Sequence, residues 1–183
     1  HPAVLTGHAN GVITLNLSEA DDAEREGRRV AMHEPYRTLL GHFRHEVGHY
    51  YWNRLIGNTD RLQAFRRLFG DESTDYGEAL QLHYKNGPPA DWPSRFVSSY
   101  ASSHPWEDWA ETWAHYLHMT DALETALACG LSLQPLRPDE PSLQPTARGD
   151  RLGAFDQMLT AWFSLTYVLN NLNRSLGWPD SYP

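Results

Sequence analysis

Apolar residues recur at helical spacing in the last part of the chain. Between residues 151 and 176 they follow one another at intervals of three and four, at Leu152, Phe155, Leu159, Trp162, Leu165 or Thr166, Leu169, Leu172 and Leu176. This period places them on one face of an α-helix. The pattern predicts a C-terminal helix over residues 151–176 that contributes to the core.

The N-terminal pattern alternates instead between apolar and polar residues. The run from Val12 to Leu17 has the two-residue period of a strand, and it follows the short run Val4 to Thr6 and the dipeptide Asn10-Gly11. Asn-Gly favours the positive φ angles of a tight hairpin turn. These features predict a small N-terminal β-hairpin.

Capping residues mark out the remaining helices. A helix from about Tyr36 to Ile56 would begin after Pro35, and a long helix would run from Pro105 to about Ala128. Two shorter helices are expected between them. Asp60 would cap the first, which ends at Gly70, and Asp75 the second, which ends at "NGPP".

The Pro-rich segment 130–149 has no apolar period and is expected to be an extended surface loop. A length of 183 residues fits one domain over residues 1–183. We therefore expect an α+β fold that is predominantly helical, with a small N-terminal hairpin.

Composition narrows the function classes. The net charge of −8 argues against nucleic-acid binding, which depends on clustered lysine and arginine. With the single cysteine Cys129 no internal disulfide can form, and no apolar run is long enough to suggest a membrane segment. We expect a cytoplasmic protein. The chain begins with His1 rather than Met, so we expect a processed chain or part of a longer protein.

The segment "FRHEVGHYYW" contains candidate metal ligands and a candidate general base. On a helix, His45 and His49 lie one turn apart, about 40° around the axis, so both imidazoles can reach one metal ion. Glu46 is rotated by about 100° from His45, which suits a general base acting on a metal-bound water. His42 is a weaker candidate ligand. Apolar residues on two sides of this helix, among them Leu40 and Phe43, predict an interior position.

A catalytic zinc ion usually has three protein ligands, so one more is needed. The pattern HExxHxxGxxH is absent, because Trp52 and Leu55 stand where it has Gly and His. In "SYASSHPWEDWAETWAHYLHM", Glu107 and Glu111 lie four residues apart on one helix face.

Small residues beside these glutamates, Ala110 and Ala114, would let another helix come close. If one glutamate binds the metal ion, the other can accept a hydrogen bond from a ligand histidine. The spacing does not decide whether Glu107 or Glu111 is the metal ligand. A solvated face that includes Asp108 is the alternative.

Two resemblances add to this reading. "HEVGH", followed by a tyrosine seven residues before Glu-x-aromatic-Ala-Glu, resembles the gluzincin-type zinc site of the anthrax lethal factor peptidase domain. That resemblance implies that Glu107 is the third ligand, that Glu111 supports a ligand histidine, and that Tyr100 donates a hydrogen bond to the reaction centre.

More widely, "VLTGHANGVITLNLSEADDAERE", "LGHFRHEVGHYYW" and "WEDWAETWAHYLH" resemble a bacterial family of zinc-binding metallopeptidases. This implies a zincin-like fold with a strand beside a central active-site helix. Longer members carry an N-terminal cysteine-rich zinc ribbon, which this chain lacks.

We expect a zinc-dependent metallopeptidase that uses one Zn²⁺ ion and acts on peptide or protein substrates. A zinc-activated water would attack the peptide bond, with Glu46 as general base. Two alternatives stay open: a catalytically weak module that binds a peptide or protein, and a zinc hydrolase acting on a non-peptide amide. Cleavage of proteins on DNA is disfavoured by the acidic charge.

Overall fold

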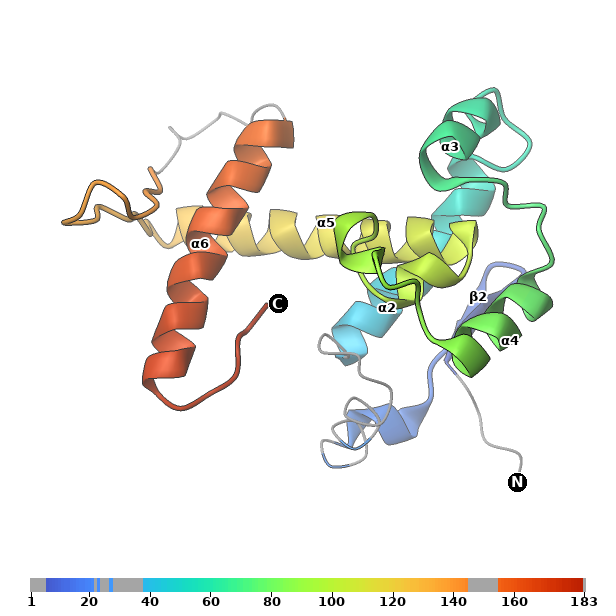
Figure 1. Cartoon of the computed structure of the whole chain (residues 1–183), viewed down its shortest axis with the longest axis horizontal. Helices are drawn as coiled ribbons and strands as arrows, with labels where there is room; N and C mark the ends of the chain where they lie inside the picture. The colour runs from blue at the N-terminus through green and yellow to red at the C-terminus, as the bar shows by residue number, and fades with distance from the viewer. Residues whose placement is uncertain (1–5, 22, 24–26, 28–37, 145–154, 183) are drawn as a thin grey trace. The chain divides into compact units, whose positions relative to one another are not determined.

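The structure of the chain is a computed structural model (Figure 1) that describes residues 6–21, 23, 27, 38–144 and 155–182. It forms two compact units, His1–Tyr116 and Leu117–Pro183, and the boundary falls within one helix. The expectation of a single domain stays a prediction. The described residues contain five α-helices and one two-stranded antiparallel sheet, which confirms a mostly helical chain with a small N-terminal hairpin.

The hairpin consists of β1 (Gly7–Ala9) and β2 (Val12–Thr14), with His8 opposite Ile13. Asn10 and Gly11 have φ angles of 50° and 81°, so the predicted turn is confirmed. The second strand is shorter than expected. It ends at Thr14 because Asn16 caps a 3₁₀ helix, η1 (Leu17–Ala20). The first described strand begins at Gly7, and Val4 and Leu5 of the predicted first run lie outside the described residues.

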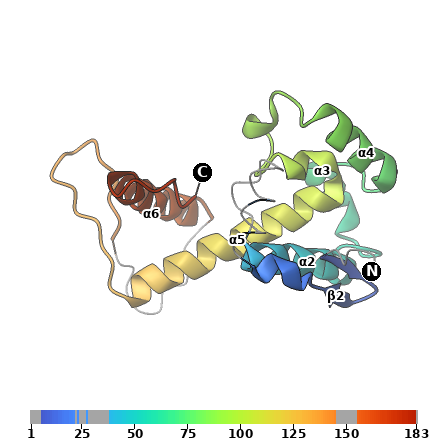
Figure 2. The same ribbon diagram turned by 90° about the horizontal axis from the view of Figure 1, so that it is seen from below.

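Helix α2 (Leu39–Leu55) carries the "HEVGH" segment and lies beside the hairpin (Figure 2). It begins later than expected, because Thr38 is its N-cap and accepts a hydrogen bond from Gly41 N; Pro35 lies outside the described residues. The expectation that both sides of this helix are covered is wrong. Leu40 is 53% exposed and Phe43 is 42% exposed.

The buried side of α2 packs on α5 (Pro105–Ala128), whose predicted bounds are confirmed. The helices approach closely at Gly48, where an added Cβ would lie 3.0 Å from Ala110 Cα. Ala110 is fully buried, which confirms its expected role as a small contact residue. Trp109 Nε1 donates a hydrogen bond to Gly48 O over 2.9 Å, so the two backbones are held together at the level of the histidines.

Gly48→Ala is expected to destabilise the protein, because the added methyl group meets backbone that cannot move aside. Overpacking of this kind costs about 1–3 kcal/mol. Gly77→Ala is the matched control: it is also helical, but its added Cβ would find nothing nearer than 3.4 Å. Urea denaturation of both variants measures the difference, and equal stabilities would contradict the close approach.

Two shorter helices follow, α3 (Leu62–Phe69) and α4 (Tyr76–Asn86). The predicted Asp75 cap is confirmed, because its side chain accepts a hydrogen bond from Glu78 N over 2.8 Å. The predicted Asp60 cap is wrong. Helix α3 starts after Arg61, whose N–H donates to Thr59 Oγ1 instead. Two 3₁₀ helices, η2 (Trp92–Ser94) and η3 (Tyr100–Ser103), lead into α5.

The second unit contains the end of α5 and helix α6 (Phe155–Ser175). Its core consists of Leu123, Ala126, Leu143, Met158, Trp162 and Leu165. The predicted C-terminal core helix is therefore confirmed for its first half. Its second half is not core, because Leu172 is 56% exposed and Leu176 is 75% exposed.

The segment 130–149 differs from the expected surface loop in the part that is described, residues 130–144. Leu133 and Leu143 form an antiparallel bridge, and Leu143 is buried in the core of the second unit. Residues 145–154 lie outside the described part of the chain, and with them the expected start of the last helix. No described helix combines the length and the apolar character that crossing a membrane requires.

Candidate metal centre

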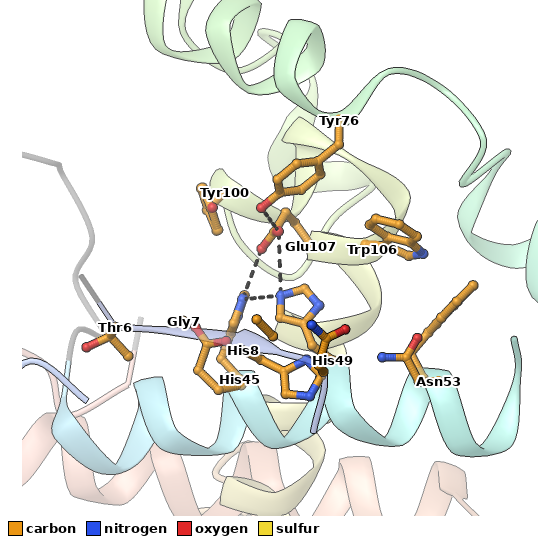
Figure 3. A pocket seen from close by; sticks show the side chains of 14 residues that line it. Thr6, Gly7, His8, His45, His49, Asn53, Tyr76, Tyr100, Trp106 and Glu107 are labelled. Carbon is orange, nitrogen blue, oxygen red and sulfur yellow. Dashed lines mark hydrogen bonds and ion pairs between the residues drawn. The ribbon is translucent and has the colours of Figure 1, made fainter. Parts of the chain in front are cut away.

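Three side chains from α2 and α5 converge in the first unit, and they form a group that could hold a metal ion (Figure 3). His45 and His49 come from α2, and Glu107 comes from the first turn of α5. One ligand atom from each lies within 4.8 Å of the others. His45 Nε2 is 3.0 Å from His49 Nε2 and 2.9 Å from Glu107 Oε2.

The orientation of His45 is held by Glu111, one turn further along α5. His45 Nδ1 donates a hydrogen bond of 2.6 Å to Glu111 Oε1, since a carboxylate can only accept. The other oxygen of Glu111 accepts a hydrogen bond of 2.7 Å from Ser98 Oγ. In the neutral imidazole the hydrogen is therefore on Nδ1, and the lone pair of Nε2 points toward Glu107.

Glu107 is not part of a solvated face. Its exposed fraction is 1%, and that of the neighbouring Asp108 is 9%, so the alternative of a solvent-facing acidic stripe is wrong. Glu107 is buried because α2 packs closely against this side of α5 at Gly48. His42 does not belong to the group of ligand atoms found among the described residues.

The site has an excess of negative charge. Burial by itself would lower the pKa of His45, but the hydrogen bonds and charges of Glu107 and Glu111 raise it to about 10. Burial would raise the pKa of Glu107, yet contacts with His45 and His49 hold it well below its usual range. The carboxylates are ionised at neutral pH, so the site demands a cation, either a proton on His45 or a metal ion.

The group opens into a cavity of about 370 Å³. Glu46 and Tyr100 line it together with the three candidate ligands, and residues 6–10 of the hairpin form another wall. The ring centroids of Tyr100 and His45 are 6.0 Å apart. Burial and the negative charge of Glu107 raise the pKa of Tyr100 well above its usual range, so its hydroxyl keeps its proton and can donate.

Two residues at this site were not predicted from the sequence. Tyr76 donates a hydrogen bond of 2.7 Å to Glu107 Oε1, and Ser98 donates to Glu111. Ser98 lies one residue before the segment singled out in the sequence, which begins at Ser99, so only its nearness to that segment offered a weak signal. Tyr76 offered none, because 31 residues separate it from Glu107.

The side chains fit a zinc ion. Two imidazole nitrogens and one carboxylate oxygen are ligands that catalytic zinc accepts, with a further position left for water or substrate. Glu107 Oε2 is buried, and His45 Nε2, 2.9 Å away, can donate to it only when His45 carries a second proton, so with neutral His45 it has no hydrogen-bond donor among the described residues. A buried carboxylate oxygen without a donor is costly, and a bound cation would remove that cost.

Comparisons with known proteins agree with this site. The chain is 54% identical over 184 residues to uncharacterized proteins of Mycobacterium tuberculosis (strain H37Rv) and Mycobacterium bovis, and these matches cover all of the chain. The chain spans about half (52%) of the length of these curated relatives. No solved structure matches it. The profile of one family, "Putative zinc-binding metallo-peptidase", matches residues 1–183, and the chain belongs to that family.

Proposed function

We propose that the chain is a zinc-dependent peptidase whose metal ion is held by His45, His49 and Glu107. The observation that carries the proposal is the convergence of these three side chains beside Glu46 in one cavity. A zinc ion bound there would act as a Lewis acid toward the substrate carbonyl and lower the pKa of a water molecule from about 15.7 toward about 7. The localisation and partners expected from the sequence stay predictions.

Glu46 is the proposed general base. It follows His45 on α2, is 9% exposed and lines the cavity. Its carboxylate would accept a proton from the water whose oxygen attacks the carbonyl carbon. The same carboxyl group would then give that proton to the amine nitrogen as the C–N bond breaks.

The hairpin is the proposed support for an extended substrate. Among the described residues β1 pairs in a sheet with β2 alone, so its other edge is open in this part of the chain, and residues 6–10 line the cavity. A peptide can pair with such an edge through its main chain. A strand beside the helix that carries the histidines is the arrangement of zincins, and we propose that this chain shares it.

A cleavage assay over a mixed peptide library tests the proposal. The zinc-loaded protein is expected to cut peptides, to stop when a chelator removes the metal ion, and to recover when zinc is restored, with products identified by mass spectrometry. Tight zinc binding without cleavage would favour the binding module. Cleavage of a non-peptide amide instead of peptides would favour the alternative of a zinc hydrolase with a non-peptide substrate. Failure to bind zinc would overturn the proposal as a whole.

Tyr100→Phe is expected to lower kcat while zinc stays bound. The proposed role of the Tyr100 hydroxyl is to donate to the oxyanion that develops on the substrate carbonyl, and loss of such a donor costs about 10²–10³-fold in kcat. Steady-state kinetics and metal analysis measure both quantities. Tyr51→Phe is the control, because Tyr51 stacks on Trp113 and does not line the cavity. Full activity of Tyr100→Phe would make Tyr100 structural.

A further inference from the structure

The two carboxylate oxygens of Glu107 have different surroundings. Oε1 accepts the hydrogen bond of 2.7 Å from Tyr76 and lies 3.5 Å from His49 Nε2. Oε2 lies 2.9 Å from His45 Nε2 and, while His45 is neutral with its hydrogen on Nδ1, accepts no hydrogen bond from the described residues. Oε1 therefore accepts from a neutral donor and lies near His49, whereas Oε2 faces His45.

Tyr76 is held in place from outside the ligand group. It is the first residue of α4, directly after the Asp75 cap, and its ring contacts the rings of His104 and Trp106. His104 is 3% exposed. Its Nε2 lies 3.2 Å from Thr74 O, and its Nδ1 accepts a hydrogen bond from Trp106 N.

His104 thus ties the loop before α4 to the start of α5. Figure 3 shows the result: Tyr76 reaches Glu107 from the side opposite His45 and His49. The tyrosine hydroxyl and the histidine nitrogens therefore approach the carboxylate from different directions.

We propose that Tyr76 is a positioning residue of the metal centre, whose hydroxyl occupies Oε1 of Glu107 and leaves only Oε2 for the metal ion. The inference rests on the proposed zinc site. It explains how a carboxylate with two oxygens would supply a single ligand. A second oxygen on the metal ion would take the position that catalytic zinc sites keep open for water or substrate.

Tyr76→Phe tests this inference without relying on turnover. The variant removes the hydroxyl and keeps the ring, and because Tyr76 is 38% exposed we expect the protein to fold. Tyr51→Phe is the matched control, since Tyr51 is similarly exposed (39%) but does not line the cavity. Zinc affinity is measured by competition with a chromophoric chelator. Coordination is followed by the visible absorption of the cobalt(II)-substituted protein, which weakens when a tetrahedral site gains a ligand.

For Tyr76→Phe we expect zinc affinity to fall by about 10- to 100-fold, as for other partners of metal ligands, and the cobalt(II) bands to weaken. Tyr51→Phe should match the wild type in both. Wild-type affinity and an unchanged cobalt(II) spectrum in Tyr76→Phe would overturn the inference alone. A loss of folded Tyr76→Phe protein, seen by circular dichroism, would assign Tyr76 a structural role and also overturn it. If the wild type binds neither metal, the proposed zinc site fails as well.

Discussion

Glu46→Gln is expected to keep its zinc and lose its peptidase activity. Glutamine has nearly the shape of glutamate but cannot accept the proton of the attacking water, and general acid–base catalysis contributes about 10²–10⁴-fold to the rate. The substitution leaves the three candidate ligands unchanged. Metal analysis should therefore give the same zinc content as the wild type, while kcat falls by at least the lower figure.

Glu124→Gln is the matched control for this prediction. Glu124 is an exposed helical glutamate in the second unit and does not line the cavity. Its replacement should leave both zinc content and kcat unchanged. Near-normal turnover by Glu46→Gln would remove Glu46 from the mechanism while leaving the proposed metal ligands in place.

Glu107→Ala is expected to lose zinc more completely than any other single change on α5. It removes a proposed ligand and leaves the Tyr76 hydroxyl without its acceptor. Loss of a residue that only supports a ligand weakens metal binding by about 10- to 100-fold, so the loss of zinc affinity in Glu107→Ala should exceed that range. Competition with a chromophoric chelator measures both affinities.

Glu111→Gln provides the graded comparison, because Glu111 contacts His45 Nδ1 rather than the group of ligand atoms. Its zinc affinity should fall only within the range for supporting residues. If Glu111→Gln proved the more damaging change, the two glutamates would have to exchange roles. Spacing along the sequence leaves that choice open, whereas the distances in the structure favour Glu107.

Local features of the fold were predictable from the sequence. The Asn10-Gly11 turn, the Asp75 cap and both ends of α5 depend on interactions between residues a few positions apart, and all are found as predicted. Two predicted helix starts were wrong. Thr38 caps α2, which therefore starts later than Pro35 suggested, and Arg61 rather than Asp60 precedes α3, without a side-chain cap hydrogen bond.

At the candidate site, too, the local features were predictable from the sequence and the contacts between helices were not. The spacing of His45, Glu46 and His49 follows from helix geometry alone, and Glu107 and Glu111 could be selected as candidates by their spacing on a second helix. Their distances to the histidines could not, because 66 residues separate His45 from Glu111. The contact at Gly48, the burial of Glu107 and the Tyr76 hydrogen bond arise only when α2, α4 and α5 pack together. The sequence by itself determined which side chains can share a helix face, since helical periodicity is local; only tertiary packing decided which faces meet, since that depends on contacts between distant segments.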